Sequence, residues 1–355
     1  MREELRQVQE KIDDIIRNDD FPASIRPESL KEAVRDYPCR GGKRLRPALL
    51  TWSCGLLGGD IEKSYFPAAA VEIYHNWTLV HDDIIDNDDF RRGLPTAHKF
   101  LERKAAETFG GAGGDFRKFG TDFAILAGDI MQGWAMNMLL KSEDTGIPPK
   151  VVLTLSRKMQ TLVNRELISG EALDVEFSYR DFDSITQPDV LEMIRMKTGI
   201  LLRFCATAGA AIALESSDMA NERVKSLGKF ASLAGVAFQL RDDWLGIFGE
   251  ESKFGKPVGS DLREKKPTML IINALGNLSV SDRSELLSYM GHENFSSSSL
   301  EKARILIRCS GAERTVEEMT NSYIAEASGI LSLFPDNKYR QLLFDFLNYL
   351  TDRKI

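Results

Sequence analysis

The segment EIYHNWTLVHDDIIDNDDFRRG, residues 72–93, joins an apolar stretch to five aspartates and then to two arginines. If the first part of this segment is helical, Asp82 and Asp86 lie four residues apart, about 40° from each other on one helix face. Two carboxylates placed in this way repel each other unless a cation lies between them. Mg²⁺ that also binds a phosphate takes one or two carboxylates and keeps its waters, so the pattern predicts a magnesium site. A solvated acidic helix end is the alternative for this segment taken alone.

A second acidic cluster follows the apolar segment FASLAGVAFQL, 160 residues after the first (242 minus 82). Asp242 and Asp243 again stand at the end of a helical pattern. Two such clusters rarely arise for solubility alone. If their helices face each other across a bundle, the carboxylates converge on one cavity, as in metal sites built between helices.

Helical periodicity extends over most of the chain, as in VVLTLSRKMQTLVNREL at 151–167 and LLRFCATAGAAIAL at 201–214. Alternating patterns typical of strands are scarce, so we predict an all-α fold. The chain has no repeat at a solenoid period and no low-complexity linker. Because the charged motifs extend from residue 41 to residue 268, we expect a single domain over residues 1–355.

The composition, 43% hydrophobic and 28% charged over 355 residues, is that of a globular protein. No apolar run of about 18 residues occurs, and the charged N-terminus lacks the pattern of a signal peptide, so we expect a cytoplasmic protein without a membrane span. The net charge of −7 argues against a nucleic-acid partner. The four cysteines form no CxxC pair, and we interpret them as small buried apolar residues: Cys39, Cys54, Cys205 and Cys309.

Positive charges accompany both acidic clusters, on segments rich in glycine. Each cation alone is more often a surface charge, but together they suggest bound phosphate groups. GGKRLRP at 41–47 is not a Walker A loop, so a nucleotide kinase is disfavoured. The cations concerned are Lys43, Arg44, Arg46, Arg91, Arg92, Lys197 next to Thr198, Lys256, Lys265 and Lys266.

Several motifs, in this order, resemble those of the trans-isoprenyl diphosphate synthases, or polyprenyl synthetases. They are GGKRLRP, the 72–93 segment, AILAGD at 124–129, KTG at 197–199, and FQLRDDWLGIFG with GKPVGSDLREKKPT between 238 and 268. The resemblance implies a helical bundle around a central active-site cavity, usually in a homodimer. It also implies head-to-tail (1'-4) condensation of isopentenyl diphosphate with an allylic diphosphate such as dimethylallyl, geranyl or farnesyl diphosphate. Magnesium and cations assist ionisation, and the released diphosphate is the plausible base.

The resemblance also assigns roles to individual residues. Asp82, Asp86 and Asp242 would hold three magnesium ions, with Asp83 and Asp243 as supporting carboxylates. Residues expected to contact the allylic diphosphate are Arg91, Lys197 and Lys256, and Lys266 is a further candidate for substrate binding. Residues that match the isopentenyl diphosphate site are Lys43, Arg46, His75 and Arg92. Thr198 and Gln239 match polar residues near the reacting carbons.

Product length should depend on the residues beneath the first motif, which helical spacing identifies as Tyr74, Trp77 and Thr78. An aromatic residue five places before the first aspartate, followed by a smaller one, resembles short-chain enzymes, often geranylgeranyl diphosphate synthases. Farnesyl or longer products, geranylfarnesyl or hexaprenyl, are the alternatives. Ordinary core packing is the other interpretation of these aromatic side chains.

Two features depart from the family pattern. Gly246 stands where many members have a third aspartate, and Asp261 could support the metal shell in its place. The segment 99–119 is longer than expected, and we interpret it as a flexible surface loop, with a dimer contact or lid as the alternative. A terpene cyclase should lack GGKRLRP, and a non-catalytic partner subunit would usually lose an aspartate motif.

Overall fold

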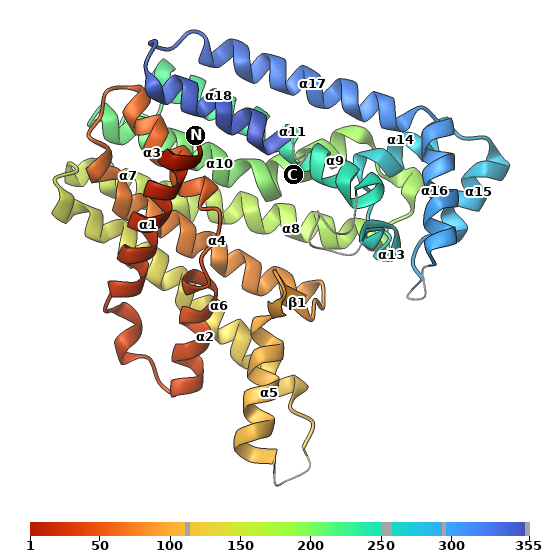
Figure 1. Ribbon diagram of the computed structural model, residues 1–355, viewed down its shortest axis with the longest axis horizontal. Helices are drawn as coiled ribbons and strands as arrows, with labels where there is room; N and C mark the ends of the chain where they lie inside the picture. Colours follow the sequence, from red (N-terminus) through yellow and green to blue (C-terminus); the bar gives the residue numbers. More distant parts are fainter. Residues whose placement is uncertain (111–113, 250–257, 293–295, 352–355) are drawn as a thin grey trace. The chain divides into compact units, whose positions relative to one another are not determined.

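A computed structural model covers residues 1–355 and describes all of them except 111–113, 250–257, 293–295 and 352–355 (Figure 1). The predicted all-α class is confirmed. The first elements are α1 (Arg2–Asn18), η1 (Phe21–Ser24), α2 (Glu28–Cys39), α3 (Leu45–Leu56), η2 (Ile61–Ser64), α4 (Tyr65–Ile85), β1 (Phe90–Arg91), β2 (Leu94–Pro95), α5 (Ala97–Phe109), α6 (Arg117–Leu140), η4 (Lys141–Thr145) and α7 (Pro149–Lys158). The next are η5 (Met159–Val163), α8 (Asn164–Tyr179), η6 (Phe182–Ser184), α9 (Gln187–Ile194), η7 (Arg195–Gly199), α10 (Ile200–Ala213) and α11 (Glu222–Phe248). The last are α13 (Ser260–Arg263), α14 (Met269–Asn277), α15 (Val280–Ser288), α16 (Ser297–Cys309), α17 (Ala312–Leu331) and α18 (Lys338–Thr351).

The helices form two compact units. The first unit comprises Met1–Arg157 and Cys205–Asn221, and the second comprises Lys158–Phe204 and Glu222–Ile355. The first aspartate cluster belongs to the first unit and the second cluster to the second unit.

Helix α4 is the centre of the first unit and packs against α6, α3, α1 and α2. Its N-terminal half carries three consecutive alanines, Ala68 to Ala70, which are all fully buried. Small side chains let neighbouring helices approach closely, and alanine has the highest helix propensity. Helix α1 covers this core with one apolar stripe, in which Leu5, Val8, Ile12 and Ile16 repeat at spacings of three and four.

Helix α11 is the centre of the second unit and packs against α17, α18 and the turn η7. Its buried residues Val236, Leu240 and Ile247 belong to one apolar cluster with side chains from α9, α14, α16 and α17. The turn η7 is a π-helical turn between α9 and α10. Such π-helical turns often occur at functional sites, and this one, RMKTG, carries the predicted site residues Lys197 and Thr198.

The expectation of a flexible surface loop at 99–119 is wrong for most of this segment. Helix α5 continues to Phe109 and α6 begins at Arg117, and the two helices pack side by side (Figure 1). Aromatic contacts hold the pair together, because Phe109 lies 6.0 Å from Phe119, which stacks on Phe123 at 4.1 Å. The sequence signal of a loop came from its glycines, of which 111 and 113 lie outside the described residues.

Two helical stretches of the described chain are long and apolar enough to cross a membrane. They are Arg117–Thr145 and Gln187–Ala213, with 44% and 72% of their most apolar windows buried inside the protein. Length and composition of this kind also occur in the core helices of globular proteins.

The four cysteines are free thiols, and the prediction of burial holds for two of them. Cys54 and Cys205 are buried, and desolvation raises the pKa of each to about 12. Cys39 is half-buried. The prediction is wrong for Cys309, which is exposed on the last turn of α16.

Candidate active site

The first aspartate motif lies at the C-terminal end of α4. Asp82 belongs to the last turn, and Asp86 ends the helix with a helical backbone conformation, φ −77° and ψ −6°. The backbone N–H of Asp86 donates to the carbonyl of Asp82 at 2.8 Å. The two residues therefore keep their i, i+4 relation on one helix face, as the spacing predicted.

Asp83 points into the protein and is fully buried. Its carboxylate accepts a hydrogen bond from the hydroxyl of Tyr37 and forms an ion pair with Arg91. Burial raises the pKa of Asp83, and Arg91 opposes that rise. Arg91 also reaches Asp82, with Nη2 3.1 Å from Oδ2. Arg91, which follows the aspartates in the sequence, thus places its guanidinium in contact with two carboxylates of the motif.

A second group of positively charged side chains, Arg46 and Arg92, lies beside His75 near the middle of α4. Nη1 of Arg46 is 3.0 Å from Nε2 of His75, and Nη1 of Arg92 donates to the carbonyl of Gly41 at 3.2 Å. The pKa of His75 lies well below its usual range because of burial and because Arg46, Arg92 and Arg91 are near. The neutral ring therefore accepts a hydrogen bond from Arg46. An anion bound at this group would meet several positive charges at once.

The GGKRLRP loop brings its residues to different places. Gly41 has a φ of +79°, a conformation that glycine adopts without strain. Lys43, two residues later, is exposed. Arg44 is 2% exposed and is bound to Glu72 at 2.6 Å and to Asp13 at 2.7 Å. The suggestion that Arg44 belongs to a phosphate site is therefore wrong, because its side chain is enclosed in the fold and cannot reach a ligand.

The predicted chain-length residues line α4 below the first motif. Tyr74 is fully buried, and its ring meets the ring of Trp77 edge to face with centroids 4.8 Å apart. The Nε1 atom of Trp77 is buried and has no hydrogen-bond partner among the described residues. Thr78 donates its hydroxyl hydrogen to the carbonyl of His75 at 2.7 Å. These contacts fix two large side chains one to two turns before Asp82.

In the second unit, a chain of hydrogen bonds connects η7 to the second aspartate motif. Thr198 donates to Oε1 of Gln239 at 3.0 Å, and Nε2 of Gln239 donates to Oδ1 of Asp243 at 2.9 Å. The pKa of Asp243 is well above its usual range because of burial and because the carboxylates of Asp261 and Asp242 are near. Gln239 therefore orients a carboxylate that lies among like charges.

Lys197 lies between two carboxylates of α8. Its Nζ atom is 2.6 Å from Asp174 and 2.9 Å from Glu171. The backbone of η7 reaches this position because α8 has a glycine there: a Cβ atom on Gly170 would lie 2.3 Å from the backbone nitrogen of Lys197. Glu171 and Asp174 were missed by sequence reasoning, although their i, i+3 spacing in SGEALD could have indicated a shared face.

The remaining predicted cations are less informative. Lys266 lies 2.9 Å from Glu264, and Lys265 lies over the ring of Phe182 with Nζ 5.7 Å from the centroid. Lys256 falls outside the described residues. Tyr37, which binds Asp83 in the first unit, was also missed by sequence reasoning. The sequence around Tyr37 does not distinguish it from an ordinary core tyrosine.

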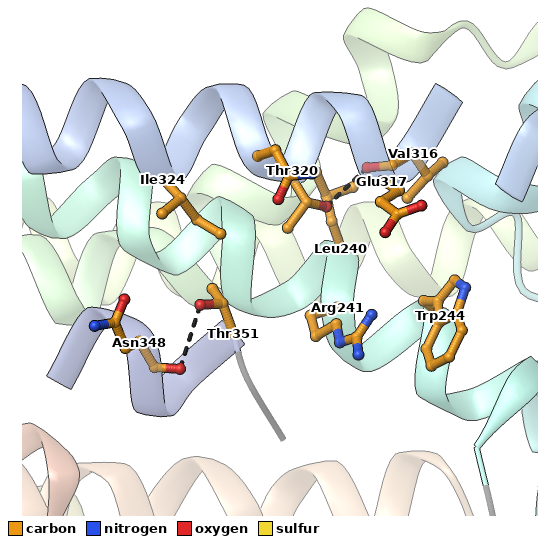
Figure 2. A pocket seen from close by; sticks show the side chains of 10 residues that line it. Leu240, Arg241, Trp244, Val316, Glu317, Thr320, Ile324, Asn348 and Thr351 are labelled. Atoms are coloured by element: carbon orange, nitrogen blue, oxygen red, sulfur yellow. Dashed lines mark hydrogen bonds between the residues drawn. The ribbon is translucent and has the colours of Figure 1, made fainter. Parts of the chain in front are cut away.

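A separate pocket lies on the side of α11 that faces α17 and α18 (Figure 2). Its volume is about 320 Å³. Arg241 stacks on Trp244 with its guanidinium carbon 4.2 Å from the ring centroid, and Nε1 of Trp244 donates to Glu313 at 3.1 Å. By helical spacing, Arg241 and Trp244 point away from Asp242 and Asp243. None of the predicted site residues lines this pocket.

The polyprenyl synthetase family matches residues 27–307 of the chain. The chain belongs to the polyprenyl synthetase family. This polyprenyl synthetase is 38% identical over 285 residues to a geranylgeranyl diphosphate synthase of Saccharolobus solfataricus, which covers 79% of this chain and 77% of that protein.

Solved structures agree with the family. A geranylgeranyl pyrophosphate synthetase from Pyrococcus horikoshii matches this polyprenyl synthetase with a TM-score of 0.84 and 31% identity, over 99% of each chain. A geranylgeranyl pyrophosphate synthase from Corynebacterium glutamicum, complexed with isoprenyl diphosphate and magnesium, matches with a TM-score of 0.85 and 27% identity over 99% of each chain. The synthetase therefore has the isoprenoid synthase fold and is a prenyltransferase.

The carboxylates fit magnesium by their number and type. Among the described residues, no group of three or more His, Cys, Asp or Glu side chains forms a protein shell around one point. Mg²⁺ does not require such a shell, because it usually keeps several waters and binds one or two carboxylates together with substrate phosphates. Asp82 and Asp86 on one helix face supply such a pair.

Proposed function

We propose that this polyprenyl synthetase condenses isopentenyl diphosphate with an allylic diphosphate, head to tail (1'-4), to give geranylgeranyl diphosphate. The observation that carries the proposal is the presence of two cationic groups along α4. Arg91 lies at the acidic end of the helix, and Arg46 contacts His75, which lies seven residues before Asp82, about 10 Å along the axis. Two groups at this separation suit two diphosphates.

Each site residue then has a role in binding or orientation. Arg91, Lys197 and Lys256 contact the allylic diphosphate, and Lys266 is a further cation for substrate binding. Residues that hold the isopentenyl diphosphate are Lys43, Arg46, His75 and Arg92. Thr198 and Gln239 lie near the reacting carbons, and their hydrogen bond to each other at 3.0 Å keeps both side chains in fixed orientations.

Magnesium, with three ions per site held by Asp82, Asp86 and Asp242, would neutralise the charge that develops on the departing diphosphate. Arg91 supplies a fixed positive charge in the same place. When the allylic carbon–oxygen bond breaks, the double bond of isopentenyl diphosphate attacks the allylic carbon, and a proton then leaves to form the new alkene. The released diphosphate accepts that proton, so no protein nucleophile is required.

The bulk beneath the first motif favours a C20 product. Trp77 and Tyr74 contact each other and place two large buried side chains one to two turns before Asp82, where we propose that they stop a longer tail. The name of the relative from Saccharolobus solfataricus supports the same product. Farnesyl diphosphate and the longer geranylfarnesyl or hexaprenyl diphosphates are the competing products, and they differ only in the depth available to the tail.

We further propose that two copies of the chain form a homodimer. Helix α6 has exposed apolar side chains, with Ile125 41%, Leu126 47% and Leu140 43% exposed, and a second copy of the chain could cover them in a homodimer. We place the enzyme in the cytoplasm. Both units belong to one polyprenyl synthase domain over residues 1–355, because the family match at 27–307 includes parts of both.

The test is incubation of the purified protein with isopentenyl diphosphate and each of dimethylallyl, geranyl and farnesyl diphosphate, with and without magnesium. Product chromatography should show geranylgeranyl diphosphate in the presence of magnesium. A longer product would support the condensation activity and contradict the proposed role of Trp77 in limiting product length. The absence of elongation with every starter would favour a non-catalytic partner subunit.

A further inference from the structure

Tyr37 lies in the last turn of α2, just before the GGKRLRP loop, and is 3% exposed. Its hydroxyl group makes two hydrogen bonds to distant parts of the first unit. It donates to Oδ2 of Asp83 at the end of α4, and it accepts from the backbone N–H of Ala97 at 3.2 Å. One buried hydroxyl therefore connects α2, the first aspartate motif and the first residue of α5.

Asp83 has both carboxylate oxygens engaged by these contacts. Oδ2 accepts from Tyr37, and Oδ1 accepts from Nε of Arg91 at 2.5 Å. Because the side chain is fully buried, neither oxygen can exchange its partner for water. The carboxylate of Asp83, the second aspartate of the motif, thus binds Arg91 rather than water or a metal ion.

The orientation of Arg91 depends on this carboxylate. Nε and Nη2 of Arg91 both contact Oδ1 of Asp83, and the same Nη2 lies 3.1 Å from Oδ2 of Asp82. Contacts with oxygens of two different carboxylates fix the plane of the guanidinium, whereas a single contact would allow it to rotate. The side chain is only 16% exposed, so its remaining N–H groups have few directions available.

We propose that Tyr37 is a positioning residue for the reaction: it fixes the carboxylate of Asp83, which in turn aims Arg91 at the diphosphate of the allylic substrate. The inference rests on the proposed function for the identity of that substrate. Tyr37 does not touch substrate itself. Loss of its hydroxyl leaves one oxygen of a buried carboxylate without a donor, so the carboxylate turns and the guanidinium turns with it.

The first experiment compares Tyr37→Phe with the wild-type enzyme in steady-state kinetics. We expect kcat/KM for the allylic diphosphate to fall about 10- to 100-fold, the range for a hydrogen bond to a charged group, with a much smaller change in KM for isopentenyl diphosphate. Tyr65→Phe is the matched control, because Tyr65 is a buried tyrosine at the other end of the same helix α4. It should leave both constants near wild type.

A double-mutant cycle separates positioning from simple structural support. In an Arg91→Ala background, Tyr37→Phe should change kcat/KM less than about 3-fold, because the guanidinium that it aims is gone. An equal fall in both backgrounds would show that Tyr37 acts independently of Arg91 and would overturn the proposal. So would an equal rise in KM for both substrates.

Two further measurements keep the result interpretable. Asp83→Asn keeps the volume but removes the charge that holds Arg91, so it should reproduce the selective loss if Tyr37→Phe folds poorly. Calorimetric titration of farnesyl diphosphate with Mg²⁺ tests Arg91 without turnover, and Tyr37→Phe should weaken binding by the same factor. If the wild type binds farnesyl diphosphate but forms no product, the proposed function fails while this binding effect can still be measured.

Discussion

Oδ2 of Asp261 lies 2.8 Å from the position that a Cβ atom on Gly246 would occupy. The N–H of Gly259 donates to the carbonyl of Gly246 at 2.8 Å, so the start of α13 approaches α11 closely at this point. By the resemblance to the family motif, Gly246 stands where a third aspartate is expected. The space beside it is taken by the carboxylate of Asp261, and the role of Asp261 in supporting the metal shell stays a prediction.

Gly246→Asp should therefore lower activity, because two carboxylates would compete for one volume. Overpacking of this kind typically costs about 1–3 kcal/mol of stability. The double variant Gly246→Asp with Asp261→Gly should recover most of the lost kcat/KM and melting temperature, whereas Asp261→Gly alone should not. An increase in activity with Gly246→Asp alone would mean that the enzyme lacks a carboxylate, and the idea of replacement by Asp261 would be wrong.

Gly170→Ala tests whether the close packing of α8 against η7 is required for activity. The new Cβ atom would lie 2.3 Å from the backbone nitrogen of Lys197, so η7 must move away from α8. A displacement of about 1 Å at reacting groups can cost about 100-fold in rate, and we expect a loss in kcat/KM of that order. Gly329→Ala on α17 is the control, since no atom lies within 4 Å of its Cβ position. Wild-type kinetics in Gly170→Ala would contradict the prediction.

Trp77→Ala should lengthen the product by at least one isoprene unit, because it removes the larger side chain of the Tyr74–Trp77 pair. Chromatography of the dephosphorylated products measures this change. Trp77→Phe keeps most of the bulk and should retain the C20 product. The alanine variant will also lose about 3–5 kcal/mol of stability, so the assay is best run well below its melting temperature. An unchanged product profile would mean that Trp77 does not limit the length of the product.

His75 should make stability depend on pH in the acidic range. Its pKa in the folded protein is well below the value of about 6.5 expected in the unfolded chain, so the unfolded state binds more protons at acidic pH. The free energy of unfolding is then highest above pH 6.5 and falls as the pH drops below it, by up to about 1.4 kcal/mol per unit.

Urea unfolding of His75→Gln and wild type at pH 5, 6 and 7 measures this contribution. The variant should show a smaller loss of stability between pH 7 and pH 5. The exposed residue His292 provides the control, and His292→Gln should behave like wild type. Parallel curves for wild type and His75→Gln would rule out the assigned role of this imidazole.

Much of the fold and the site could be predicted because the relevant signals are local. Apolar residues at spacings of three and four fixed the helical class, and the i, i+4 spacing placed Asp82 and Asp86 on one face of α4. The segment 99–119 was predicted wrongly because glycines indicated a loop, whereas aromatic contacts such as Phe119 with Phe123 sustain two helices. Arg44 was grouped with its neighbours because sequence does not reveal burial.

The sequence by itself determined the helical class, the two aspartate motifs and the family, since these depend on residue type and spacing along one helix. The tertiary structure alone decided which charges are available. It paired Arg44 with Glu72, placed Lys197 between Glu171 and Asp174, and brought the hydroxyl of Tyr37 to Asp83 across 46 residues. The reason is physical: the partner of a buried polar group is set by packing between elements, and no local pattern encodes that choice.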